Sequence, residues 1–240
     1  MLRWVTLIYF AGNIAVKPLG STPQNVRSTP IMGYQPKDTY FKRAKREGYR
    51  SRAAYKLLEL NRRFHLIKPG DHVVDLGAAP GGWLQVVSKL IGEGGRVVGV
   101  DLQPMEPFRE NNIHLLQGDI TSEDTQSKIK ELLGGTADCV LSDLSPRLSG
   151  IHATDLSRSL ELAQAAFKLA TALLKTKGGL LVKTFVGDET TAFLMELKPH
   201  FASTQRARSE ATRKGSSEMY LIARGFRLDS FRQVTTTRND

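Results

Sequence analysis

The sequence contains a single cysteine, Cys139, which excludes an internal disulfide and a cysteine-rich metal site. Because Cys139 lies in an apolar run, we expect a buried, unreactive thiol. The five histidines are scattered without the spacing of metal ligands, so we expect no bound metal. The apolar stretch over residues 4–16 is broken by Gly12 and Asn13 and is too short to span a bilayer, so we expect no association with a membrane.

Acidic residues are absent from the first 37 positions, and a stretch rich in proline, serine and threonine follows residue 16. Three interpretations remain open: a disordered tail, an acid-poor organelle transit peptide, or sequence upstream of a true start at Met32. We expect a dispensable or disordered extension over 1–36, a single domain over 37–227, and a disordered tail over 228–240. The expected location is the cytoplasm, or the mitochondrion if the extension is a transit peptide.

Basic residues are in large excess: the formal net charge is +10 and the isoelectric point is about 9.8. Such a chain favours a polyanionic partner, and we expect nucleic acid rather than a membrane. Residues 37–68 hold eleven Lys or Arg against three acids. Apolar residues recur at helical spacing in that block, which predicts a helix with Ser51 as its N-cap. The apolar stripe of this helix consists of Ala53, Leu57, Leu60 and Phe64.

After residue 70 the hydrophobic pattern alternates between strands and helices. We expect strands near 73–76, 96–101, 113–117, 138–142, 179–185, 201–206 and 218–223. We expect helices near 82–91, 123–133, 156–176 and 189–198, the third of them stopped by Gly178 and Gly179. This alternation predicts an α/β fold of the Rossmann-like kind, with a seven-stranded, mostly parallel sheet and helices on both faces. Because no helix separates the last two strands, we expect the final strand to be antiparallel.

The segment VVDLGAAPGGW, residues 73–83, predicts a ligand site. An apolar strand ends at Asp75 and runs through a Gly/Ala/Pro turn into a helix. Glycines let bare backbone approach a ligand, and in an open α/β sheet the ligand lies outside the carboxyl ends of the strands. We therefore expect a nucleotide-like cofactor. The spacing is not the dinucleotide fingerprint G-x-G-x-x-G, which argues against an NAD-dependent oxidoreductase.

Charged residues stand at the ends of the other predicted strands, where they would face the same crevice. Asp101 suits the hydroxyls of a ribose, and Asp119 suits an adenine amine, although a turn aspartate would explain it equally well. Asp143 ends the fourth strand. Lys183 is a lone cation at the end of an apolar strand, and Glu218 begins the last strand. A lysine in such a strand is costly unless the strand end opens onto a site.

These motifs resemble the FtsJ (RrmJ) family of S-adenosylmethionine-dependent RNA 2′-O-ribose methyltransferases, over about residues 38–226. The matching segments are GYRSRAAYKLLEL, VVDLGAAPGGW, VVGVDL, QGDI, VLSDLSP, GGLLVKTF and SSEMYLIARGF. The resemblance implies a catalytic tetrad of Lys56, Asp143, Lys183 and Glu218. It also implies that S-adenosylmethionine is held by Asp75, Gly77, Pro80, Gly81, Trp83, Asp101, Leu102, Asp119, Ile120 and Asp143. Many relatives have Asn or Met-Ala-Pro-Asn where this chain has residues 143–147, so substrate contacts could differ there.

Methyl transfer to a ribose hydroxyl is an in-line displacement that needs close alignment of three atoms and removal of a proton. Lys183 is the candidate base, and because a free lysine has a pKa of about 10.4, we expect burial and the cation of Lys56 to lower that pKa. Asp143 would orient Lys183, and Glu218 would hold Lys56 or the ribose.

The resemblance implies an RNA substrate and a monomeric enzyme. Candidate RNA-binding residues are Lys42, Arg43, Lys45, Arg46, Arg50, Arg52, Arg206, Arg208 and Arg213. Similarity to the compact bacterial and mitochondrial members implies methylation of a uridine in the A-loop of large-subunit ribosomal RNA, within or before the assembled subunit. A methyltransferase acting on a tRNA anticodon loop is the alternative within the family. A ribosome assembly factor without activity is the alternative outside it, and a complete tetrad argues against that alternative.

Overall fold

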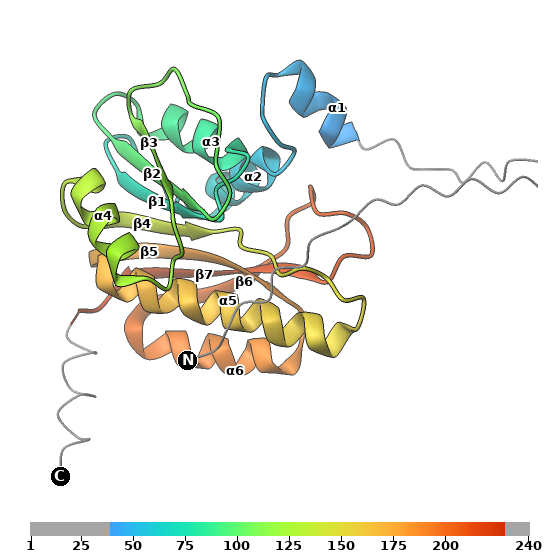
Figure 1. Ribbon diagram of the computed structural model, residues 1–240. Coiled ribbons are helices and arrows are strands. Elements are labelled where there is room, and N and C mark those ends of the chain that lie inside the picture. The colour runs from blue at the N-terminus through green and yellow to red at the C-terminus, as the bar shows by residue number, and fades with distance from the viewer. Residues whose placement is uncertain (1–38, 229–240) are drawn as a thin grey trace, which may run out of the picture. The chain divides into compact units, whose positions relative to one another are not determined.

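The structure is a computed structural model that describes residues 39–228. The expected extension over 1–36, and all but the first residue of the expected tail over 228–240, lie outside the described residues. A sheet of seven strands runs through the described part in the order β3-β2-β1-β4-β5-β7-β6 (Figure 1). The strands are β1 (His72–Leu76), β2 (Arg96–Asp101), β3 (Ile113–Gln117), β4 (Ala137–Ser142), β5 (Leu174–Phe185), β6 (Phe201–Ala207) and β7 (Glu218–Phe226).

Strands β1 to β5 are parallel, and β7 is inserted antiparallel between β5 and β6. The α/β fold with a mostly parallel sheet and an antiparallel last strand is therefore confirmed. The reversed strand has a consequence for the site: β7 begins where the parallel strands end, on the right of Figure 1. In the β5–β7 register Glu218 pairs with Phe185, and Tyr220 pairs with Lys183.

Helices cover both faces of the sheet because consecutive strand residues point to opposite sides. On one face, Val73, Val97 and Leu141 pack with α2 (Ala54–Phe64) and α3 (Gly82–Ile91). On the other, Val74 and Val98 pack with α4 (Glu123–Leu133), α5 (His152–Leu173) and α6 (Asp188–Leu197). The basic helix α1 (Thr39–Arg46) adds a small third cluster, and the 3-10 helix η1 (Lys198–His200) leads into β6.

The boundaries of the long helix differ from the prediction. The helix begins at His152 rather than residue 156, because the Asp155 carboxylate accepts the backbone N–H groups of Ser149 and Gly150 and fixes the turn before it. It ends at Leu173, and β5 starts at once with Leu174 paired to Ala137. The predicted stop over 176–179 was wrong, since Gly178 and Gly179 lie inside β5. A Cβ at Gly178 would sit 2.9 Å from the Lys175 carbonyl oxygen, so the strand needs a glycine there.

The prediction that Ser51 caps a helix was also wrong. Helix α2 begins at Ala54, and its N-cap residue Ala53 makes no side-chain capping bond. The Ser51 hydroxyl instead packs on the start of α3, where a Cβ at Gly82 would lie 2.2 Å from it. Ser51 therefore packs the segment before α2 against α3, the helix that follows the glycine-rich turn.

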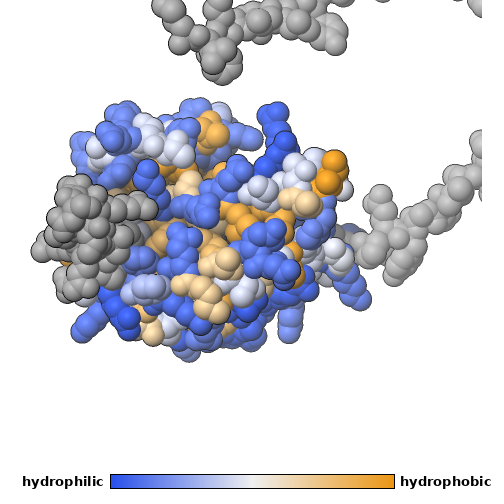
Figure 2. Space-filling model, turned by 90° about the horizontal axis from the view of Figure 1, so that it is seen from below, coloured by the Kyte–Doolittle hydropathy of each residue, from blue (hydrophilic) through white to orange (hydrophobic). Residues whose placement is uncertain are grey.

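Cys139 is fully buried, and burial raises the pKa of its thiol, as the apolar run predicted. Within residues 39–228, no helix has the length and apolarity that crossing a membrane requires. In Figure 2 the face seen from below, which includes α5 and α6, carries hydrophilic side chains around apolar patches. Met195 of α6 and Ile151 at the start of α5 are among the exposed large apolar residues.

Candidate active site

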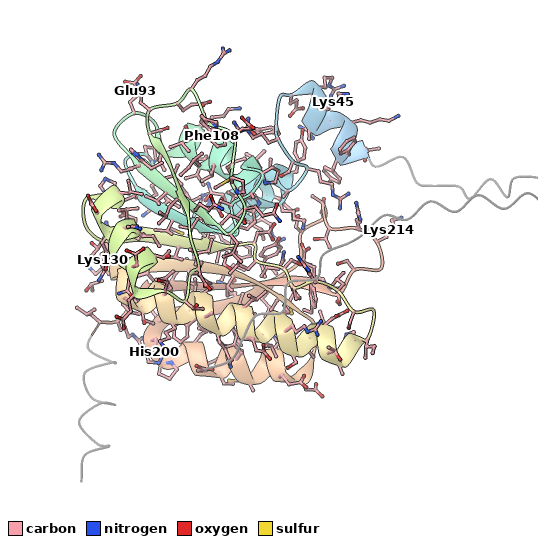
Figure 3. The ribbon with its side chains drawn as sticks, in the orientation of Figure 1. Lys45, Glu93, Phe108, Lys130, His200 and Lys214 are labelled. Atoms are coloured by element: carbon pink, nitrogen blue, oxygen red, sulfur yellow. The ribbon has the colours of Figure 1, made fainter. Side chains whose placement is uncertain are left out.

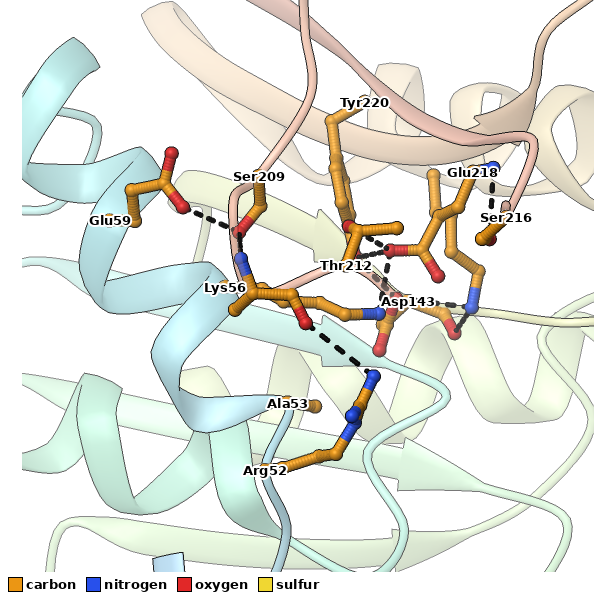
Figure 4. A network of polar contacts seen from close by, with 12 residues as sticks. Arg52, Ala53, Lys56, Glu59, Asp143, Ser209, Thr212, Ser216, Glu218 and Tyr220 are labelled. Carbon is orange, nitrogen blue, oxygen red and sulfur yellow. Dashed lines mark hydrogen bonds and ion pairs between the residues drawn. The ribbon is translucent and has the colours of Figure 1, made fainter. Parts of the chain in front are cut away.

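Five polar side chains form a continuous series of contacts at the carboxyl ends of β4 and β5 (Figure 4). Lys183 Nζ donates to the Asp143 carbonyl at 2.6 Å and lies 3.1 Å from Asp143 Oδ1. The Tyr220 hydroxyl lies 2.9 Å from Asp143 Oδ1 and 3.1 Å from Glu218 Oε1. Glu218 Oε1 in turn accepts from Lys56 Nζ at 2.6 Å. The four tetrad candidates are thus brought together, with Tyr220 between the two acids.

The sheet and α2 explain how these residues meet. Tyr220 and Leu181 belong to the core cluster that α2 and α3 cover, so their side chains lie on the face of the sheet that packs against α2. Side chains two positions apart on a strand share a face, which puts Lys183 and Glu218 on that face as well. The apolar stripe of α2 docks there through Leu57 and carries its neighbour Lys56 to Glu218.

Both lysines are nearly buried, with exposed fractions of 8% for Lys56 and 6% for Lys183. Buried cations are stable only when paired, and each lysine has its own acid. The contacts link Lys56 to Lys183 through both carboxylates and the Tyr220 hydroxyl.

Tyr220 is the residue of this site that the sequence analysis missed. Burial and the two neighbouring carboxylates raise the pKa of its hydroxyl well above the usual value, so it remains a proton donor. It has one proton and two acceptors, and can donate to Asp143 or to Glu218 but not to both at once. The available signal was period-two spacing: Tyr220 follows Glu218 by two residues in a predicted strand.

A cavity of about 700 Å³ opens at the ends of β1 to β4. Six expected cofactor residues line it: Gly77, Asp101, Leu102, Asp119, Ile120 and Asp143. Asp143 belongs both to this cavity and to the tetrad, so the cavity ends at the catalytic candidates. A cavity of this size fits a nucleoside-type cofactor.

The acids of the cavity are held by backbone donors. Asp101 accepts from the N–H groups of Ala79 at 3.0 Å and Gln103 at 2.9 Å. Asp119 Oδ1 accepts from the backbone and hydroxyl of Thr121, which lowers the pKa of this carboxyl. Asp119 is therefore a turn aspartate that also faces the cavity. Ionised carboxylates accept hydrogen bonds from hydroxyl and amine groups, which are the donors of a ribose and an adenine.

Four expected cofactor residues do not line this cavity. Asp75 is fully buried in β1, and its carboxyl oxygens have no hydrogen-bond partner in the described part of the chain. Burial raises its pKa well above the usual range, which favours a neutral acid. Trp83 donates its indole N–H to the Ala53 carbonyl at 2.8 Å and packs on Tyr220 with ring centroids 6.0 Å apart. Pro80 and Gly81 form the turn before α3, next to Arg50.

Arg50, an expected RNA-binding residue, makes several contacts within the protein. Its guanidinium donates to the carbonyls of Pro80, Glu106 and Pro107, at 3.4, 2.7 and 2.6 Å. It also lies 3.5 Å above the Phe108 ring. Arg50 thus connects the segment before α2 to the glycine-rich turn and to the loop after β2, and both of these border the cavity of about 700 Å³.

The remaining RNA-binding candidates occupy two groups. Figure 3 shows Lys45 of α1 and Lys214 of the β6–β7 loop on the side where β7 begins. The first group, on α1, consists of the exposed residues Lys42, Arg43, Lys45 and Arg46, with Arg43 paired to Glu47. The second group comprises Arg52, Arg206, Arg208 and Arg213. Arg206 donates to Thr191 at 3.2 Å and Arg208 donates to the Ser216 carbonyl at 3.2 Å, whereas Arg213 projects from the loop.

The chain is similar to known methyltransferases over nearly all of its described part. The family model of the FtsJ-like methyltransferase matches residues 49–226. A protein of Methanothrix thermoacetophila named ribosomal RNA large subunit methyltransferase E is 49% identical, over 80% of this chain and 74% of its own length. The protein of the same name from Archaeoglobus fulgidus is 49% identical, over 79% of this chain and 96% of its own.

Solved structures agree with this result. A crystal structure from Plasmodium falciparum, assigned as a ribosomal RNA methyltransferase, has a TM-score of 0.67 and 29% identity, and the match covers 74% of this chain and 98% of that one. A chain of a fibrillarin/Nop5p complex, at 18% identity and a TM-score of 0.51, covers 71% of this chain and 81% of its own and shares the fold alone. Since the family model spans residues 49–226, the chain belongs to the FtsJ-like methyltransferase family.

Proposed function

We propose that this protein transfers a methyl group from S-adenosylmethionine to a ribose 2′-hydroxyl of large-subunit ribosomal RNA, at a uridine of the A-loop. The observation that carries the proposal is the position of the tetrad between two cavities. Asp143 lines the cofactor cavity, and Lys56 and Glu218 line a second cavity of about 260 Å³. The names of the archaeal relatives support ribosomal RNA as the substrate.

The residues of the site suit this reaction. When bound, S-adenosylmethionine supplies a methyl group on a sulfonium, which an oxygen nucleophile attacks in line. In the transfer the carbon–sulfur bond would break as the carbon–oxygen bond forms. Lys183 would take the hydroxyl proton as a neutral amine, after its ammonium has released a proton to solvent. Asp143 holds Lys183 through its carbonyl and its carboxylate. Glu218 and Lys56 hold the ribose from the other side. The Tyr220 hydroxyl lies between the two carboxylates and positions them relative to each other.

The proposal is tested by mapping 2′-O-methyl groups in ribosomal RNA and tRNA from cells that lack the protein. We expect one methyl group to be missing from large-subunit ribosomal RNA, at a uridine, and tRNA to be unchanged. The wild-type gene should restore the methyl group, and a Lys183→Ala gene should not. Loss of methylation only in a tRNA anticodon loop would contradict the proposed substrate, and unchanged methylation of both RNAs would contradict the activity.

We expect Arg50 to act on cofactor binding rather than on RNA binding. Arg50→Ala should weaken the affinity for S-adenosylmethionine about tenfold, because charge-assisted bonds to the two loops beside the cavity are lost. Arg50→Lys should weaken the affinity for S-adenosylmethionine nearly as much, since an ammonium cannot reproduce the planar fork that reaches three carbonyls. Isothermal titration calorimetry of each variant with S-adenosylmethionine measures this effect.

Arg46→Ala is the matched control, because Arg46 is exposed on α1, the helix just before Arg50, and does not line the cavity. We expect it to keep the wild-type affinity for the cofactor. If Arg50→Ala weakened RNA binding and left cofactor affinity unchanged, the phosphate-binding role first expected for Arg50 would be correct.

A further inference from the structure

A pocket of about 480 Å³ lies between α1, α2, α3 and the loop that joins β6 to β7. On α2, Leu58 and Arg62 follow Lys56 by two and six residues, which at about 3.6 residues per turn puts them on roughly the opposite side of the helix from the tetrad. Among the described residues, this outer pocket shares no lining residue with the two cavities beside the tetrad. The residues that could contact a ligand in it include Tyr40, Leu58, Asn61, Arg62, Leu90 and Glu210.

The walls of the outer pocket are apolar and aromatic. Leu58 and Leu90 are partly buried against the core cluster that α2 and α3 cover. The Tyr40 ring packs with its centroid 5.5 Å from that of Tyr55. Tyr55 is held in turn by its hydroxyl, which donates to Glu47 at 2.9 Å. Aliphatic side chains and fixed aromatic rings favour a planar ligand that stacks on them.

Two opposite charges in the outer pocket are available to a ligand. Arg62 and Glu210 are both exposed, and within residues 39–228 neither side chain makes a hydrogen bond or an ion pair. One cation and one carboxylate give no net charge, so the pocket does not favour a phosphate. It favours a neutral ligand that has both donors and acceptors. The other charged residues of the pocket already have partners, Arg43 with Glu47 and Glu59 with Arg63.

Hydrogen bonds within the protein fix the polar groups of the outer pocket. Glu59 Oε2 accepts from the Glu210 backbone N–H at 2.8 Å and from the Ser209 hydroxyl at 2.6 Å, the second of which Figure 4 draws. The loop that carries the Glu210 carboxylate is therefore attached to α2. Asn61 Oδ1 accepts from the Ile67 N–H at 2.9 Å, which leaves the amide NH₂ as the end that can donate to a ligand.

We propose that the outer pocket binds a guanine base of the RNA substrate. Guanine presents two adjacent N–H donors, at N1 and N2, which match the two oxygens of the Glu210 carboxylate. Its acceptors O6 and N7 match the guanidinium fork of Arg62. The faces of the base stack on the apolar and aromatic walls. Adenine lacks O6 and the N1 proton, and uracil has a single ring N–H between two carbonyls, so neither base offers both pairs of groups.

A guanine base can belong to a free nucleotide or to RNA, and the choice of RNA rests on the proposed function. Lys56 of the tetrad and Arg62 of the outer pocket lie on opposite sides of the same helix, whose diameter is about 10 Å. One RNA strand that places a ribose at the tetrad can therefore extend around α2 to the outer pocket. Contacts to a base carry sequence information, which the phosphate contacts expected of the basic residues do not. The outer pocket would thus select the RNA segment next to the target.

The base preference is tested by titrating the full chain with guanosine or adenosine 5′-monophosphate and following the NMR spectrum. Both nucleotides carry the same phosphate, and saturating S-adenosylhomocysteine keeps them out of the cofactor cavity. We expect the guanosine nucleotide to bind the wild-type protein about tenfold more tightly, since one matched pair of hydrogen bonds discriminates between bases by that factor. Glu210→Gln and Arg62→Ala should each remove the preference, because each removes one of the two matching groups.

Arg109→Ala is the matched control, because Arg109 is an exposed arginine that lines a different cavity, at the start of β2 and β3. It should keep the wild-type preference for the guanosine nucleotide. Equal binding of the two nucleotides to the wild type, no detectable binding of the guanosine nucleotide, or a full preference in either pocket variant would each overturn the guanine site.

Two short RNAs, UUGUU and UUAUU, distinguish a base of RNA from a free nucleotide. We expect the wild type to bind UUGUU about tenfold more tightly than UUAUU, and Glu210→Gln to bind them equally. If the wild type preferred the guanosine nucleotide but bound the two RNAs equally, RNA would be the wrong source of the base. Binding is measured without turnover, so a wild type that prefers UUGUU but methylates no ribosomal RNA would refute the proposed function and leave the guanine site standing.

Discussion

Replacing Lys183 by alanine is expected to slow methyl transfer about a thousandfold while leaving cofactor affinity within a factor of about two, because general-base contributions are of that size. Among the described residues, Lys183 is not part of the lining of the cofactor cavity, and its Nζ contacts the carbonyl and the carboxylate of Asp143. Single-turnover transfer of a labelled methyl group to unmethylated large-subunit ribosomal RNA measures the rate. Calorimetric titration with S-adenosylmethionine measures the affinity.

Lys183→Arg separates proton removal from charge. A guanidinium keeps the positive charge beside Asp143 but does not lose its proton at accessible pH. If Lys183 accepts the hydroxyl proton, the arginine variant should be nearly as slow as the alanine variant. If it only supplies charge, the arginine variant should recover most of the rate, and the assignment of Lys183 as base would be wrong.

That the tetrad candidates at strand ends lie close together could be predicted from the sequence. Asp143, Lys183 and Glu218 were expected in one crevice because parallel strands end at the same edge of a sheet. The position of Glu218 follows from the antiparallel last strand, which was also expected and is confirmed. Lys56 came from the family resemblance alone, since a charged stripe on a helix does not by itself indicate which strand it faces.

What the sequence could not supply were contacts between distant segments. Arg50 donates to carbonyls of residues 106 and 107, and Tyr220 reaches Asp143 in another strand. A basic residue in a basic block is indistinguishable from its neighbours until its partners are known, so Arg50 was grouped with the RNA-binding candidates. Similarly, Ser51 fits the sequence pattern of an N-cap, but its hydroxyl packs on Gly82 of α3.

We also expect the tetrad to affect the free energy of unfolding, because its charges are buried as ion pairs. Asp143→Ala should lower the free energy of unfolding by about 3 kcal/mol, since Lys183, 6% exposed, is left without its counter-ion. The same change removes a residue that lines the cofactor cavity, so cofactor affinity should fall together with the transfer rate. Urea denaturation measures the stability, and calorimetry measures the affinity.

The double variant Asp143→Ala, Lys183→Met distinguishes an unpaired charge from lost packing. Replacing both partners of a buried pair by apolar groups often changes the stability little, whereas removing one partner leaves the other charge buried without a counter-ion. We expect the double variant to regain most of the stability lost in Asp143→Ala and none of the activity. If its stability stayed as low as that of Asp143→Ala, the loss would come from the Tyr220 hydroxyl bond and the cavity left by the carboxylate, and the Lys183–Asp143 pair would not be what makes Asp143 necessary for the fold.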